Sequence, residues 1–98
     1  MFERELRRFQ TLIRERRYIL TIHALEEMGE DDILDEDIEN VVLRGQIVER
    51  QVDRATRERK YVITGKDVAG EPVGVVLKMG STGKVIVITV YHEESEES

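Results

Sequence analysis

Residues 73–92 read VGVVLKMGSTGKVIVITVYH, and this stretch decides the fold. Two runs rich in β-branched residues, 73–79 and 84–92, flank Gly80-Ser-Thr-Gly83, whose glycines suit a tight turn. The stretch therefore predicts two antiparallel strands joined by a hairpin, because parallel strands need a crossover of about a dozen residues or more.

Two further strands are expected upstream of this hairpin. After Gly45 the pattern changes from helical to alternating, and it predicts strands over 46–52 and 59–65 joined by a charged connection. Short connections again make neighbouring strands antiparallel. We therefore predict a four-stranded antiparallel sheet.

The N-terminal part of the chain has the helical period instead. Apolar residues recur there at steps of three and four: Phe2, Leu6, Phe9 and Ile13. This spacing predicts an amphipathic helix over 2–17. Thr21 is the expected N-cap of a second helix over 22–29, which is expected to end at Gly29.

A third helix is expected between Asp35, as its cap, and Gly45, as its end. Helices followed by strands define an α+β domain, in which N-terminal helices pack on one face of the sheet. The 98 residues allow one such domain, expected over 1–92, followed by a disordered acidic tail over 93–98.

Composition excludes several classes of protein. The chain has no cysteine, which excludes a disulfide scaffold and a thiol nucleophile. No run approaches the about 20 apolar residues of a membrane span, and the N-terminus is charged from Glu3, unlike a signal peptide. We therefore expect a cytoplasmic protein with no membrane partner.

The net charge of −6 is distributed very unevenly along the chain. Residues 1–17 hold six arginines against three glutamates, and residues 41–66 hold seven basic and three acidic side chains. Residues 26–40 hold nine carboxylates and no basic residue. The net charge therefore does not exclude a nucleic-acid partner, because two basic segments are available to meet phosphate.

Alternation within the strands predicts which sheet face stays open. The bulkier apolar side chains should lie under the helices, with Ile86, Ile88 and Val90 on the covered side of the last strand. The other face would be mildly cationic over a floor of valines, and would carry Lys60, Thr64, Lys78, Thr89 and Tyr91. A dimer partner that covers those valines is the alternative.

The order and spacing of four motifs resemble one family. They are Thr21-Ile-His23-Ala24, an acidic helix start near Asp35, Gly45-Gln-Ile47-Val-Glu49 and Val85-Ile-Val-Ile-Thr89-Val-Tyr91. From about Tyr18 to His92 the chain resembles the family known as domain of unknown function 4258. The resemblance implies a fold similar to that of small RelE- and barnase-like ribonuclease toxins. Where the family's His-Ala helix often carries arginines on its next turn, residues 25–30 here read LEEMGE.

A ribonuclease that works without a metal ion needs a base, an acid and cations for the phosphate. The expected catalytic residues are His23, Tyr91 and His92. The expected phosphate-binding residues are Arg50, Arg59, Lys60 and Lys78. Each also has a plain structural interpretation, as a histidine bonded to backbone, a pair at a strand end or a solvated surface cation. Only two histidines exist, far apart in sequence, so we expect no metal and no cofactor.

Two functions stay open from the sequence. The first is a toxin-like ribonuclease that acts on RNA and is neutralised by an antitoxin-like protein. The second is a non-catalytic α+β module that binds a protein partner or forms a homodimer. The arginine-rich first helix has an apolar stripe with two interpretations: the stripe docks such a partner, or it packs in the core of the domain.

Overall fold

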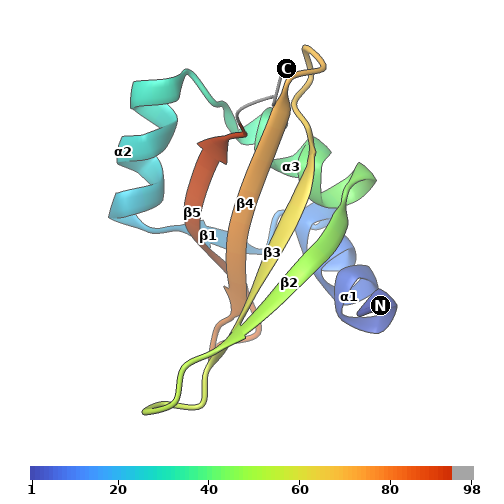
Figure 1. Cartoon of the computed structure of the whole chain (residues 1–98), viewed down its shortest axis with the longest axis vertical. Coiled ribbons are helices and arrows are strands. Elements are labelled where there is room, and N and C mark those ends of the chain that lie inside the picture. Colours follow the sequence, from blue (N-terminus) through green and yellow to red (C-terminus); the bar gives the residue numbers. More distant parts are fainter. Residues whose placement is uncertain (94–98) are drawn as a thin grey trace, which may run out of the picture.

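The computed structural model describes residues 1–93, which form three helices and one five-stranded sheet (Figure 1). The elements in chain order are α1 (Glu3–Arg14), β1 (Tyr18–Leu20), α2 (Ile22–Asp31), α3 (Asp35–Arg44), β2 (Gln46–Val52), β3 (Arg59–Lys66), β4 (Pro72–Met79) and β5 (Val85–His92). The predicted α+β class is confirmed. The tail predicted over 93–98 lies, apart from Glu93, outside the described residues.

The sheet has one strand more than the four that the sequence predicted. Its order is β1-β5-β4-β3-β2, and β1 pairs in parallel with β5, whereas the other neighbours are antiparallel. The prediction was wrong because Tyr18–Leu20 is too short to show a strand period. This strand also separates α1 from α2, so the helices do not form an unbroken N-terminal block.

The predicted cap of α2 is confirmed, but its predicted end is wrong. The backbone N–H of Ala24 donates to Thr21 Oγ1 at 3.1 Å. The helix continues past Gly29 to Asp31, and Asp32 takes the left-handed cap conformation with φ 54°. The N-terminus of the helix is therefore set by a local side-chain bond that sequence can predict.

The start of α3 lies one residue earlier than expected, because its N-cap is Leu34 rather than Asp35. The Asp37 carboxylate accepts the Leu34 N–H at 2.9 Å and, through its other oxygen, the Val68 N–H at 3.0 Å. Asp37 therefore fixes the helix start and also ties it to the loop that follows β3.

The helix-side core joins α1 and α3 to one face of the sheet (Figure 1). Its largest fully buried side chains include Phe9 and Ile13 from α1, and Ile38, Val41 and Val42 from α3. No helix in residues 1–93 is long and apolar enough to cross a membrane.

A β-bulge in β5 changes the face that each of its residues occupies. Val76 pairs with Thr89 and Leu77 with Val87, so Ile88 is an extra residue. Val87 and Val90 are both fully buried as a result. The prediction that Ile86 and Ile88 lie under the helices was wrong, because strict alternation cannot account for the inserted residue.

Candidate functional site

The sheet face opposite α1 and α3 is the open face, defined by three rows of cross-strand partners. The first row is Gln46, Thr64, Gly74 and Tyr91; the second is Glu49, Val62, Val76 and Thr89; the third includes Gln51 and Lys60. Directly paired residues project from the same face of a sheet. This face therefore combines apolar valines at its centre with polar and charged groups around them.

Tyr91 places its hydroxyl over the middle of the open face. A Cβ atom on Gly74 would stand 2.2 Å from Tyr91 Cζ and 2.4 Å from the hydroxyl oxygen, so the phenol occupies the space above Gly74. Burial raises the pKa of Tyr91, and the carboxylates of Glu93 and Glu49 raise this pKa further. The phenol is thus protonated at neutral pH and is available as a hydrogen-bond or proton donor.

A second bulge brings Glu49 to the open face and removes Arg50 from it. Ile47 pairs with Ile63 and Glu49 with Val62, so Val48 is an extra residue in β2. Arg50 then faces the helices, where its guanidinium carbon lies 5.1 Å from the ring centroid of Phe2. Sequence reasoning missed Glu49 because a bulge leaves no pattern that alternation could reveal.

The cations are divided between the two faces of the sheet. Lys60 and Lys66 lie on the open face by their register in β3. Sequence reasoning missed Lys66 because the strand was expected to end at residue 65. Lys78 also lies on the open face by its register in β4, and its ammonium is 3.0 Å from Glu58 Oε2. Arg59 instead pairs with Val52 on the helix side.

His23 lies beside the edge of β5, in a small network with a carboxylate. Its Nε2 is 3.3 Å from Glu27 Oε1, and the same oxygen accepts the backbone N–H of Val90 at 3.0 Å. Strand β1 pairs with β5 only at residues 85–87, and further along β5 it is the Glu27 side chain of α2 that accepts a backbone N–H. Glu27 therefore links the predicted histidine to the strand that carries Tyr91.

His92 lies at the other end of α2, where its Nε2 is 2.9 Å from the carbonyl oxygen of Asp31. A ten-residue helix is about 15 Å long, so the structure does not bring His92 and His23 together. Within residues 1–93 no group of three or more histidines and carboxylates is placed to hold a metal ion.

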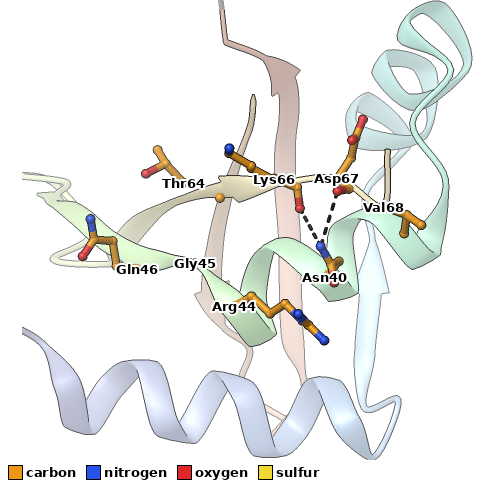
Figure 2. Close-up of a pocket in the computed structure, with 9 residues that line it drawn as sticks. Asn40, Arg44, Gly45, Gln46, Thr64, Lys66, Asp67 and Val68 are labelled. Carbon is orange, nitrogen blue, oxygen red and sulfur yellow. Dashed lines mark hydrogen bonds between the residues drawn. The ribbon is translucent and has the colours of Figure 1, made fainter. Parts of the chain in front are cut away.

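A cavity of about 740 Å³ adjoins the open face where α3 meets the end of β3 (Figure 2). It is lined by Asn40, Arg44, Gly45, Gln46, Thr64, Gly65, Lys66, Asp67 and Val68. Figure 2 shows Thr64 and Lys66 on one side of β3 and Arg44 on the opposite side. The amide of Asn40 donates to the carbonyl oxygens of Lys66 at 2.8 Å and Asp67 at 3.4 Å, which fixes this wall.

The fold and this face define a small α+β protein with a half-open sheet that carries a tyrosine, a carboxylate and lysines. A family model described as "Domain of unknown function (DUF4258)" matches residues 20–92, and the chain belongs to this family. No curated protein and no solved structure matches the chain. The expected likeness to RelE- and barnase-like toxins therefore has no support from a sequence or structural neighbour.

Proposed function

We propose that the protein is a toxin-like ribonuclease that cleaves single-stranded RNA on the open face without a metal ion. The observation that carries the proposal is the Tyr91 hydroxyl above Gly74, on the same face as Glu49, Lys60 and Lys66. This face offers the three groups that the reaction needs: a proton donor, a proton acceptor and cations.

The reaction assigns one role to each group. The Glu49 carboxylate takes the proton of a ribose 2′-hydroxyl, and the 2′-oxygen attacks the adjacent phosphorus. The bond from phosphorus to the 5′-oxygen breaks, and Tyr91 gives its proton to that leaving oxygen. The products are a 2′,3′-cyclic phosphate and a free 5′-hydroxyl, and proton exchange with water restores both side chains.

The spacing of the strands leaves room for a phosphodiester between acid and base. Glu49 lies on β2 and the Tyr91 hydroxyl lies above β4, which is two strands away, or about 10 Å. Lys60 and Lys66 flank this space on β3 and offset the negative charge of Glu49. Their role in the proposal is to bind the phosphate and to stabilise the charge that develops on it.

The test measures cleavage of a fluorescent single-stranded RNA by the purified protein. Tyr91→Phe and Glu49→Gln should each lower the rate by about 100-fold or more, because each removes an acid or base. Tyr18→Phe is the matched control, since it makes the same chemical change on the helix side, and it should leave the rate unchanged. An RNA with a 2′-deoxy sugar at the cleaved position should resist cleavage.

Two results would overturn the ribonuclease proposal. One is the absence of any RNA cleavage by the wild-type protein. The other is cleavage at equal rates by wild type, Tyr91→Phe and Glu49→Gln, which would assign the activity to a contaminant or to another site. The cleavage products identify the mechanism, because a terminal 2′,3′-cyclic phosphate forms only when the 2′-hydroxyl attacks the phosphorus.

One observation favours the alternative, a module that binds an antitoxin-like protein or a second copy of this chain. Three apolar side chains are exposed where β1 leads into α2: Ile19 (46%), Ile22 (76%) and Leu25 (51%). Light scattering with Ile22→Glu tests it, because an interface through this edge predicts a wild-type dimer that the variant dissociates. A monomeric wild-type protein would contradict self-association.

A further inference from the structure

The β2–β3 hairpin carries a cavity apart from the Tyr91 site. This cavity of about 270 Å³ is lined by Arg57, Glu58, Arg59, Tyr61, Lys78 and Met79. Figure 1 shows that the hairpin projects past the helices at the lower end of the molecule. Its tip, residues 53–58, is exposed throughout. A long ligand on the open face can therefore reach the hairpin without meeting a helix.

The carboxylates of the hairpin are engaged, but its guanidinium groups are not. Asp53 Oδ1 accepts the backbone N–H groups of Ala55 at 2.8 Å and Thr56 at 3.0 Å. Glu58 binds Lys78. In the described part of the chain, no salt bridge involves the hairpin arginines, Arg54, Arg57 and Arg59. The hairpin therefore presents unpaired positive charge next to the cavity.

Arg57 occupies a backbone conformation that glycine adopts at lower cost. Its φ is 61°, in the left-handed region, and its N–H donates to the Asp53 carbonyl oxygen at 2.8 Å. A glycine at position 57 would form the same turn with less backbone strain, so the geometry of the turn does not explain why an arginine is present. The position of Arg57 on the wall of the cavity does give one, because a guanidinium binds a phosphate through two parallel hydrogen bonds.

We propose that Arg57 and Arg59 at the hairpin cavity bind a backbone phosphate of single-stranded RNA, while Lys78 neutralises the Glu58 carboxylate on the cavity wall. The inference rests on the proposed function and adds a second contact for the same substrate. Lys78 follows Gly74 by four residues on β4, which places the cavity about 13 Å along the strand from the Tyr91 hydroxyl.

By register Lys78 projects from the open face, whereas Arg59, Tyr61 and Met79 project from the helix side, so the cavity lies at the hairpin end of the sheet, where the two faces meet. An RNA strand on the open face of β4 passes Lys60 and Lys78 and reaches the cavity by turning round this end of the sheet.

The experiment measures binding separately from cleavage. The probe is a fluorescent single-stranded RNA with 2′-O-methyl groups, which cannot be cleaved by 2′-attack, and its affinity is measured over a series of salt concentrations. Arg57→Gly should weaken binding about tenfold at low salt and reduce the slope of log affinity against log salt by about 0.7, the effect of losing one phosphate contact. Arg57→Gly also relieves the left-handed backbone, so its unfolding midpoint should not fall.

Two matched variants complete the design. Arg57→Lys keeps the charge and should retain the slope, while Arg8→Gln removes one exposed arginine from α1 and should leave it unchanged. The inference would be overturned if Arg57→Gly had the same salt slope as the wild type, or if it lost no more RNA affinity than Arg8→Gln. Absence of RNA binding by the wild-type protein would overturn it as well. Binding that depends on Arg57 without cleavage of ordinary RNA would support the inference while it overturns the proposed ribonuclease.

Discussion

The phenol of Tyr91 occupies the space that a side chain at Gly74 would need, with Tyr91 Cζ 2.2 Å from the position of an added Cβ. Gly74→Ala must therefore move the phenol. The ring end is flexible, so we expect a change in the free energy of unfolding of about 1 kcal/mol or less. The displaced phenol should lose burial, and its pKa should fall towards 10.0.

Ultraviolet titration of the phenolate measures this shift, and the RNA cleavage rate should fall with it. Thr64→Ala is a suitable control, because Thr64 lies beside Gly74 in the same row and, within residues 1–93, no hydrogen bond joins its side chain to the phenol. A Tyr91 pKa that is the same in Gly74→Ala and wild type would show that the phenol does not depend on this glycine.

Glu27 gives α2 a defined structural role at the edge of β5. Glu27→Ala would leave the Val90 N–H without its acceptor, and we expect a loss of about 1–2 kcal/mol in the free energy of unfolding. Glu27→Gln keeps an acceptor oxygen of similar reach and should lose less than half as much. Chemical denaturation measures both, and amide hydrogen exchange at Val90 should accelerate only in Glu27→Ala. Equal exchange rates in the two variants would exclude the bond as the cause.

The parts of the fold that could be predicted are those in which local chemistry repeats. The period of α1, the Thr21 cap and the four longer strands all leave a pattern in consecutive residues. Strand β1 could not be predicted, because its three residues are held by parallel pairing with β5, far along the chain. That pairing depends on tertiary contacts that no local pattern encodes.

The candidate site was harder to predict than the fold, and the two bulges are the physical reason. An extra residue at Val48 exchanges the faces of Glu49 and Arg50, and one at Ile88 keeps Thr89 and Tyr91 on the open face. Strict alternation thus placed Lys60, Lys78 and Tyr91 on the correct face, while it misplaced Ile86 on the covered side. The bulge in β2 could not be predicted, so the sequence could not show that Glu49 replaces Arg50 on this face.

Alkaline pH should destabilise the protein through Tyr18. Burial raises the pKa of Tyr18 well above its ordinary 10.0, and so does Glu39, whose Oε2 accepts a hydrogen bond from the Tyr18 hydroxyl at 2.6 Å. The phenol stays protonated in the folded protein while it ionises in the unfolded chain above about pH 10, so the unfolded state gains stability as pH rises.

The contribution of Tyr18 to the free energy of unfolding should therefore be constant below about pH 10 and should fall as the pH rises above it. Tyr18→Phe should lose about 1 kcal/mol at pH 8, because a hydrogen bond to a carboxylate is removed, and then show a weaker decline above pH 10. Urea denaturation at pH 8 and pH 11 measures both effects. Parallel declines in wild type and Tyr18→Phe would assign the alkaline transition to other groups.

Gly45, which follows the last residue of α3, and Gly29, inside α2, should respond to alanine in opposite directions. At Gly45 an added Cβ would stand 2.3 Å from the Thr64 carbonyl oxygen and 2.4 Å from that of Val41, and backbone atoms cannot move aside as a side-chain end can. Its φ of −88° is open to any residue, so the close approach of α3 to β3 is the reason for glycine. Gly45→Ala should therefore lower the free energy of unfolding by about 3 kcal/mol or more.

Gly29 lies inside α2 with nothing within 4 Å of an added Cβ. Gly29→Ala should raise the free energy of unfolding by about 0.5–1 kcal/mol, because alanine loses less backbone entropy in a helix. Urea denaturation of the two variants beside the wild type measures both signs. A destabilised Gly29→Ala would mean that α2 needs flexibility there, whereas a Gly45→Ala as stable as wild type would mean that α3 does not approach β3 as closely as described. Because the cavity of Figure 2 is built on this approach, Gly45→Ala should also open the wall formed by Asn40 and Lys66.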